Sequence, residues 1–292
     1  MKQSISLCLS LACSALAAQT PSSNLMPDGS RDAYVGIGIS SRPVYEGAND
    51  QRTDAVPAVQ IDWSNGVFIA GSTVGWHVSD QPRLEYGPLL SLQTGRTEAG
   101  TRTGLDPVDL TNTAGSVTTP PTGLLPGSVP PLPPGSTRLS GMQGIDPHLE
   151  LGGFVNFYLT PQLRMTTSLV SGGANQRAAW RGTVDIQRVF RPAAPHHSFS
   201  VSAGVTLVNN DYNQAYFGVT AAQALRSDNR QYSPAGGVKD VHLDLRWKWF
   251  LTPSWLLVST VRASRLLGDA AASPLVDNAD QLTLTSGLAY RF

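Results

Sequence analysis

One histidine and one aspartate lie two residues apart in a segment whose alternation predicts a β-strand. His242 and Asp244 alternate with apolar residues, so their side chains point to the same face of that strand. With a serine from another strand, such as Ser200, they could form a hydrolytic triad. The alternative is a network of paired charges in a narrow interior, where an unpaired charge is costly. We prefer the network, whose members are Glu150, Arg164, Arg181, Asp185, His242, Asp244, Arg246, Lys248 and Arg262.

Other kinds of chemistry have little support in the sequence. The chain contains no G-x-S-x-G, H-E-x-x-H or glycine-rich phosphate-loop motif. His196 and His197 are adjacent beside prolines in a predicted turn, where solvated histidines are more common than metal ligands. We therefore expect no catalytic residues, no cofactor and no metal site. The 21 basic and 21 acidic residues cancel, so the chain lacks the charge pattern of a nucleic-acid-binding protein.

The first residues are typical of a targeting signal. Residues 1–17 combine an early lysine, a short apolar run and an Ala-Leu-Ala pattern, which predicts a secretory signal peptide. Both cysteines, Cys8 and Cys13, lie within it, so the mature chain 18–292 has no thiol chemistry. The alternative is a lipoprotein that keeps Cys13 as its first residue. No later apolar run reaches the roughly 18 residues of a membrane-spanning helix, which excludes a helical membrane protein.

Most of the mature chain alternates between apolar and polar residues, which is the period of a strand with two different environments. The last residues, 281–292, show the pattern most clearly. Further candidate strands lie at 35–40, 55–63, 66–77, 83–94, 149–157, 163–170, 179–189, 199–207, 215–222, 241–251 and 254–264. Most candidates are near the roughly ten residues that a tilted strand needs to cross a bilayer.

This pattern fits either a soluble sandwich or a membrane barrel, and three features favour the barrel. The polar faces carry small residues and charges of both signs, which suit a narrow lumen. The chain ends on Tyr290 and Phe292, which resembles the signal that the barrel-assembly machinery recognises. Aromatic residues gather at strand ends, as in interfacial girdles: Trp63, Trp247, Trp249, Phe250, Trp255, Tyr290 and Phe292. We predict an all-β, antiparallel transmembrane β-barrel, surrounded by lipid, in the outer membrane of a Gram-negative bacterium.

The expected number of strands is ten to twelve. Leu159-Thr160-Pro161 and Leu251-Thr252-Pro253 look like equivalent short turns, and the second must be periplasmic because only two strands follow it. If the first is periplasmic too, the candidate 215–222 belongs to an external loop and one N-terminal strand is miscounted. Residues 97–145 interrupt the barrel as a long loop rich in proline and glycine. This loop is either a passive insertion or, through its polyproline character, a docking segment.

Short segments along the mature chain resemble a known family. Pro43-Val44-Tyr45-Glu46-Gly47 is similar to the P-x-Y-x-G signature of the MipA/OmpV family. Other similar segments follow in family order at Gly95-Arg96, 216–219, 236–240, 265–270 with 273–276, and 290–292. The proline-rich stretch near 105–135 departs from the family pattern, which puts any function carried by that loop in doubt.

The resemblance implies an outer-membrane barrel. For the MltA-interacting member of the family it also implies a scaffold that joins a lytic transglycosylase to a penicillin-binding protein. We therefore expect a scaffold or interaction barrel, with a small porin-like channel as the alternative and an outer-membrane hydrolase as a less favoured one. The motif residues proposed as partner contacts are Tyr45, Gly47, Tyr216, Phe217 and Gly218.

Overall fold

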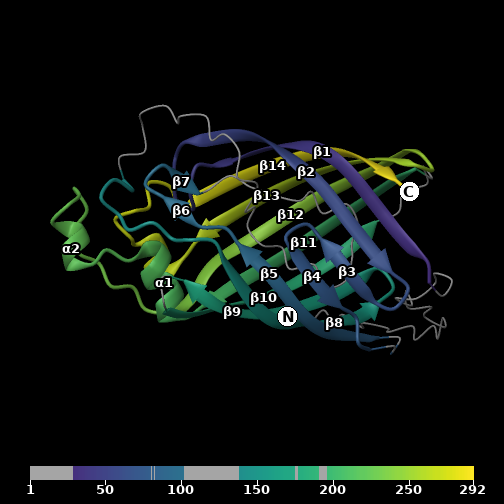
Figure 1. Cartoon of the computed structure of the whole chain (residues 1–292), viewed down its shortest axis with the longest axis horizontal. Coiled ribbons are helices and arrows are strands. Elements are labelled where there is room, and N and C mark those ends of the chain that lie inside the picture. The colour runs from purple at the N-terminus through teal and green to yellow at the C-terminus, as the bar shows by residue number, and fades with distance from the viewer. Residues whose placement is uncertain (1–28, 80, 82, 102–137, 175–176, 191–195) are drawn as a thin grey trace, which may run out of the picture.

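Twelve strands of one antiparallel sheet close into a barrel (Figure 1). The structure is a computed structural model that describes residues 29–79, 81, 83–101, 138–174, 177–190 and 196–292. The order around the barrel is β1 (Arg31–Pro43), β14 (Asp280–Arg291), β13 (Trp255–Leu266), β12 (Gly237–Thr252), β11 (His197–Val208), β10 (Arg177–Phe190), β9 (Leu163–Ala174), β8 (His148–Thr160), β5 (Leu84–Gln93), β4 (Thr73–Trp76), β3 (Val67–Ala70) and β2 (Gln51–Trp63). The predicted all-β barrel is confirmed, with twelve strands.

The two faces of the sheet differ as strands in lipid require. Leu243 and Leu245 of β12 are half-exposed on the outer surface. The residues that alternate with them, His242, Asp244 and Arg246, are buried on the inner surface. A soluble protein would place the apolar side chains inside, so this inverted arrangement identifies a membrane barrel.

Connections at the two ends of the barrel differ in length. At the end where β1 begins and β14 ends, here called the terminal end, several turns are short, among them 64–66, 161–162 and 253–254. At the opposite end, here called the loop end, long segments connect β5 to β8 and β11 to β12. Both Leu-Thr-Pro turns lie at the terminal end, as equivalent turns should.

Two strand assignments made from the sequence are wrong. The candidate 215–222 instead contains the end of helix α1 (Asn210–Phe217) and the start of α2 (Ala221–Ala224). Asn209 begins α1, because its side chain accepts a hydrogen bond from Tyr212 N at 3.0 Å. The candidate 66–77 is a hairpin of two strands, β3 and β4, because Gly71 takes a φ of +58° and turns the chain. One strand is therefore lost and one gained.

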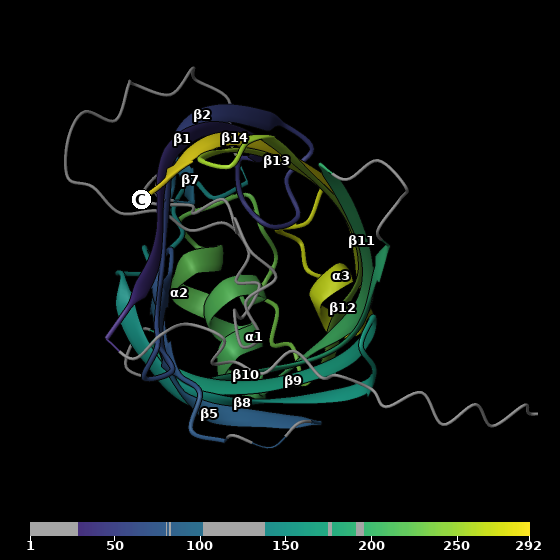
Figure 2. The same ribbon diagram turned by 90° about the vertical axis from the view of Figure 1, so that its right-hand side faces the viewer.

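Segments at the loop end pack across the interior of the barrel. They include α1, α3 (Gly268–Ala271) and a hairpin of β6 (Arg96–Thr97) and β7 (Gly100–Thr101). Figure 2 looks in from the terminal end and shows these helices inside the ring of strands. We call the described connecting segments at the loop end the plug; they are 44–50, 94–101, 138–147, 209–236 and 267–279.

Two apolar clusters hold the plug to the wall and to itself. In the first, Tyr212, Tyr216 and Phe217 of α1 pack against wall residues that include Ala179 and Leu266. The second joins four connecting segments through Val44, Tyr45, Ala48, Leu139, Met142, Val219 and Leu275. Because burial of apolar surface is worth about 25 cal/mol per Å², these contacts contribute to the stability of the plug. In the described part of the chain, no helix is both long enough and apolar enough to cross a membrane.

The assignment of outer and inner faces can be tested on β12. We expect Leu245→Arg to lower the free energy of unfolding by about 2–4 kcal/mol, because it places a charge on the lipid-facing surface near the middle of the strand. Leu225→Arg is the control, since Leu225 is 89% exposed beyond α2 and should change stability by about 0.5 kcal/mol or less. Urea titration of the protein in liposomes measures both values. Equal effects would show that the faces are assigned wrongly.

Candidate functional site

The segments that carry the family resemblance meet in the plug. Five of the six quoted groups lie at or next to the loop end: 43–47, 95–96, 216–219, 236–240, and 265–270 with 273–276. The remaining group, 290–292, lies at the terminal end. These residues are far apart in the sequence, and the loops of different hairpins bring them together. The plug is therefore the candidate functional site.

Gly47 joins two of these segments through its backbone. Its φ is +100°, and a Cβ atom there would lie 2.7 Å from Val276 Cγ2, so only glycine fits. Its carbonyl oxygen accepts hydrogen bonds from Asp277 N at 2.8 Å and Asn278 N at 3.1 Å. The nearby Tyr45 hydroxyl donates to Asp277 Oδ2 at 3.3 Å. Burial and the Asp277 carboxylate raise the pKa of Tyr45, so this phenol remains a proton donor.

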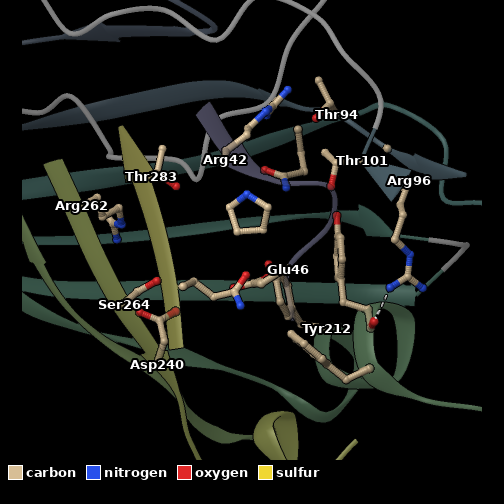
Figure 3. Close-up of a pocket in the computed structure, with 16 residues that line it drawn as sticks. Arg42, Glu46, Thr94, Arg96, Thr101, Tyr212, Asp240, Arg262, Ser264 and Thr283 are labelled. Carbon is tan, nitrogen blue, oxygen red and sulfur yellow. Dashed lines mark hydrogen bonds between the residues drawn. The ribbon is translucent and has the colours of Figure 1, made fainter. Parts of the chain in front are cut away.

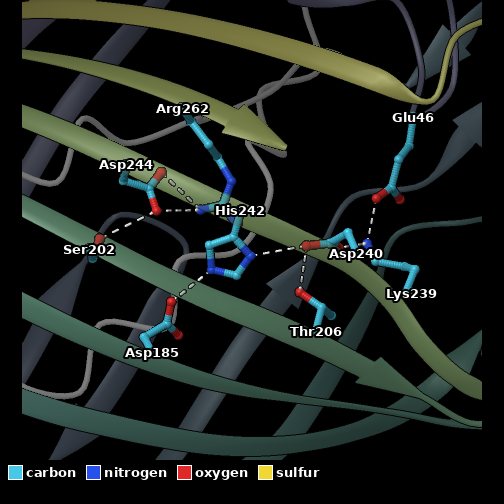
Figure 4. A network of polar contacts seen from close by, with 9 residues as sticks. All are labelled: Glu46, Asp185, Ser202, Thr206, Lys239, Asp240, His242, Asp244 and Arg262. Atoms are coloured by element: carbon cyan, nitrogen blue, oxygen red, sulfur yellow. Dashed lines mark hydrogen bonds and ion pairs between the residues drawn. The ribbon is translucent and has the colours of Figure 1, made fainter. Parts of the chain in front are cut away.

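A β-bulge turns a lysine into the barrel. The register of β12 against β11 shifts at Thr206 and Leu207, so that Lys239 and Asp240 both face inward. Lys239 is 1% exposed, and its Nζ pairs with the Glu46 carboxylate and lies 3.2 Å from Asp240 Oδ2 (Figure 4). The bulge thus connects the 236–240 motif to the 43–47 motif.

His242 follows this pair on β12 and connects β12 with β10 across β11. Its Nδ1 is 3.0 Å from Asp240 Oδ1, and its Nε2 is 2.7 Å from Asp185 Oδ1 on β10 (Figure 4). The second contact crosses β11 at Gly204, where a Cβ atom would lie 2.2 Å from Asp185 Oδ1. Glycine at this position leaves the space that the histidine–aspartate contact occupies.

The nine charged residues expected in the lumen all lie on inner-face positions of their strands. Arg181 Nη2 donates to Glu150 Oε2 at 2.9 Å, and both side chains are almost fully buried. Arg262 Nη1 donates to Asp244 Oδ1 at 3.2 Å. Neutral side chains also contact members of this set. Arg164 Nη2 donates to Gln187 Oε1 at 2.9 Å, and Ser202 Oγ donates to Asp244 Oδ2 at 3.4 Å. Arg246 and Lys248 are buried nearer the terminal end and also have interaction partners.

The residues considered for a hydrolytic triad are not arranged as one. Both ring nitrogens of His242 are in contact with carboxylates. In the pairing of β11 with β12, Ser200 lies opposite Arg246. Asp244 lies opposite Ser202, and His242 lies opposite Gly204, which is four residues from Ser200 along β11. His197 stacks on Trp247 and Trp249 on the outer surface, and His196 is exposed. Within the described residues, no group of three or more potential metal ligands occurs.

The five motif residues named as partner contacts are buried. Tyr45, Tyr216 and Phe217 are between 1% and 8% exposed, and Gly47 and Gly218 are buried with them. Main-chain carbonyls of this group accept hydrogen bonds from Ser273 Oγ and from Arg96 Nη1, at 2.6 Å and 2.5 Å. The structure therefore gives these residues internal contacts. No role was predicted for Lys239, Asp240 or Ser273, although all three stand in the quoted motifs.

Tyr290 and Phe292, the expected assembly signal, lie at the terminal end. Their ring centroids are 5.0 Å apart, and Trp255 packs against Tyr290 at 5.2 Å. Phe292 is 73% exposed, and its N–H donates to the Ala33 carbonyl oxygen at 2.9 Å. The last residue therefore continues the pairing between β14 and β1 that closes the barrel.

A small cavity lies between the plug and the inner wall (Figure 3). Its volume is about 100 Å³. Charged residues of both signs line it, with aromatic residues of α1 on one side; they include Arg42, Glu46, Arg96, Asp240, Arg262, Tyr212, Tyr216 and Phe217.

Comparison with known proteins gives a family match over most of the chain. The sequence model of the family described as MltA-interacting protein MipA matches residues 35–292. Outer membrane protein OmpV of Vibrio cholerae serotype O1 is 33% identical over 90 residues, which are 31% of this chain and 34% of that protein. The MltA-interacting protein of Escherichia coli (strain K12) is 28% identical over 89 residues, 30% of this chain and 36% of that protein. Each match therefore spans about a third of the relative's length.

Two outer membrane channels are among the solved structures that are similar to this chain. An outer membrane channel from Pseudomonas putida F1 has a TM-score of 0.41 and 10% identity, over 93% of this chain and 98% of that one. The outer membrane channel DcaP of Acinetobacter baumannii has a TM-score of 0.38 and 6% identity, over 90% and 96% of the two chains.

The need for glycine at position 204 can be tested by adding a single methyl group. We expect Gly204→Ala to lower the free energy of unfolding by about 1–3 kcal/mol, because the new Cβ displaces the Asp185 and His242 side chains from their contact. Gly173→Ala is the control, since nothing lies within 4 Å of a Cβ at that position of β9. Denaturant titration measures both variants. A similar small change in both would mean that the contact across β11 contributes no stability.

The bulge lysine can be tested with a double-mutant cycle. We expect Lys239→Met to cost about 3–5 kcal/mol, because it leaves the carboxylates of Asp240 and Glu46 without their cation. Glu46→Gln should cost less, since its side chain is 29% exposed. In the double variant, the loss should be smaller than the sum of the single losses by about 1–3 kcal/mol. Simple additivity would contradict a direct coupling of the two side chains.

Proposed function

Since the chain belongs to the MltA-interacting protein MipA family, we propose that it is an interaction barrel that holds murein-synthesising and murein-hydrolysing enzymes together at the outer membrane. The family and fold are those of outer-membrane barrel proteins. The proposal rests on one observation. The motif residues are buried in the plug, where they contact one another. Such residues build a stable platform, and partners must bind elsewhere on it.

The lengths of the connections indicate which end faces the partners. Outer-membrane barrels have short periplasmic turns and longer external loops. By this rule the terminal end faces the periplasm and the plug faces outward. Murein and the enzymes that act on it are periplasmic, so we place the docking surface at the terminal end.

Charge at the terminal end favours an acidic partner surface. The exposed charged side chains of the described residues there are arginines: Arg31, Arg83, Arg188 and Arg291. We call them the arginine rim. Arg291 is already paired with Asp32 at 2.7 Å, whereas Arg188 lies on the outer face of β10, with its guanidinium 5.1 Å from the centroid of the Phe190 ring. Rim charges of one sign steer an oppositely charged partner and raise its association rate.

A porin-like channel remains the alternative function. The plug packs across one end of the barrel, and the described inner wall carries many buried, paired side chains, so we expect the lumen to conduct poorly. The third class, an outer-membrane hydrolase, is disfavoured by the contacts of His242 with two carboxylates.

Partner binding can be tested by reversing charge at each end. We expect the pair Arg31→Glu and Arg83→Glu to lower the association rate with a purified lytic transglycosylase about tenfold, because it removes the attractive field at the docking surface. The matched control is Arg226→Glu with Arg230→Glu, two exposed arginines of the plug, which should leave the rate unchanged. Surface plasmon resonance of the protein in nanodiscs measures the rates.

A loop deletion separates this proposal from docking at the other end. The proline-rich segment 105–135 lies outside the described residues, and its neighbours Thr101 and Arg138 are at the loop end. On the present account its deletion leaves transglycosylase binding intact. If the deletion or the plug charge reversal abolishes binding and the rim reversal does not, docking is at the loop end.

A further inference from the structure

The cavity beneath the plug combines a buried cation with walls of mixed character, in which Pro43 and Phe217 lie among polar residues. Segment 93–96, the β1–β2 loop, α1 and the strands β13 and β14 surround it (Figure 3). Its volume of about 100 Å³ is somewhat smaller than the roughly 150 Å³ of an engineered cavity that holds benzene. The space therefore suits a molecule of only a few heavy atoms.

Arg96 is held rigidly at the edge of this cavity. Its N–H donates to the Ile145 carbonyl oxygen at 2.9 Å, and Ile145 N donates back to the Arg96 carbonyl oxygen at 2.7 Å. The preceding residue must be glycine, because a Cβ atom on Gly95 would lie 1.8 Å from the Ile145 oxygen. These contacts fix the position of the Arg96 backbone, and the residue is only 6% exposed.

The charge of Arg96 has no carboxylate directly against it. Its Nη1 donates to the carbonyl oxygen of Tyr216, a neutral acceptor, at 2.5 Å. Among the described residues, no acidic oxygen lies within the 4.0 Å of an ion pair with this guanidinium. The acidic groups that line the cavity, Glu46 and Asp240, both pair with Lys239 instead.

Burial acts on this uncompensated charge. Removal from water lowers the pKa of the Arg96 guanidinium, and the neighbouring Tyr216, Tyr45 and Glu46 oppose that effect only in part. Arginine nevertheless stays protonated in proteins, so the cost of burying its charge remains. An anion in the cavity would remove that cost by forming a charge-assisted hydrogen bond.

A second polar group on the same wall lacks a partner. Thr94 lies two residues before Arg96 and lines the cavity, and it is 1% exposed. Its Oγ1 has no hydrogen-bond partner among the described residues. A buried hydroxyl is usually satisfied by a protein group, water or a ligand, so Thr94 marks a position at which a bound molecule gains a hydrogen bond.

We propose that this cavity is a binding site for a small carboxylate, with Arg96 pairing with the carboxylate, Thr94 adding a hydrogen bond, and Pro43 and Phe217 enclosing the apolar remainder. This site is independent of the arginine rim, which lies at the opposite end of the barrel.

Isothermal titration of the purified full-length barrel with propionate and with propionamide tests the proposal. Propionamide has nearly the same shape and no charge. We expect saturable binding of propionate, binding of propionamide at least tenfold weaker, and a loss of propionate affinity of at least tenfold in Arg96→Gln. Arg138→Gln is the matched control, because Arg138 is an exposed arginine of the same plug paired with Asp277. Its affinity for propionate should equal that of the wild type.

Two milder variants separate binding from folding. Thr94→Val keeps the shape of the side chain and should weaken propionate binding several-fold, and Arg96→Lys keeps the charge and should retain part of the affinity. The proposal is overturned if wild-type protein shows no saturable binding of propionate, which would leave a water-filled space. It is also overturned if propionamide binds as tightly, or if Thr94→Val and Arg138→Gln have equal effects.

Discussion

A lysine side chain that points into a closed barrel needs an anionic partner, and Lys239 pairs with two carboxylates, those of Glu46 and Asp240. The bulge in β12 turns it inward beside Asp240, and Glu46 reaches it from the loop between β1 and β2. Because a buried ammonium without a partner is costly, the position of that loop is tied to the register of β12. Gly47, the next residue, then fixes the β13–β14 loop through Asp277 and Asn278. The plug and the cavity beneath it depend on this chain of contacts.

The composition of the polar faces, the aromatic strand ends and the C-terminal residues favoured a barrel over a sandwich, whereas the strands, their two faces and their approximate number followed from sequence alternation. It depends only on neighbouring residues, which explains both its success along β12 and its failure at 215–222. There the alternation is real, but the Asn209 cap and the packing of Tyr212 and Tyr216 against the wall favour a helix. The turn at Gly71 was missed for the same reason, since one glycine inside an alternating run can divide it.

The site was only partly predictable. The inward-facing charges follow from strand period, so Glu150, Arg181 and His242 could be named, but not which residues they contact. Those contacts join strands that are not neighbours: His242 of β12 contacts Asp185 of β10 across Gly204 of the intervening strand β11. The motif residues were recognisable as a set, yet their burial in one plug depends on loops of separate hairpins meeting. Tyr45 and Tyr216, which were expected as partner contacts, are buried in this plug, because aromatic residues in long loops often provide the core of those loops.

The motif segments form one cooperative plug, and Lys239 joins two of them through its pairing with Glu46. Hydrogen–deuterium exchange of the full-length protein in nanodiscs, with and without Lys239→Met, measures this directly. We expect the amides in 44–50, 96–101, 210–217 and 268–276 to be protected in the wild type. In the variant they should lose protection together, while the amides of β8 to β10 keep theirs. Independent loss of protection in these segments, or rapid exchange of all four in the wild type, would contradict it.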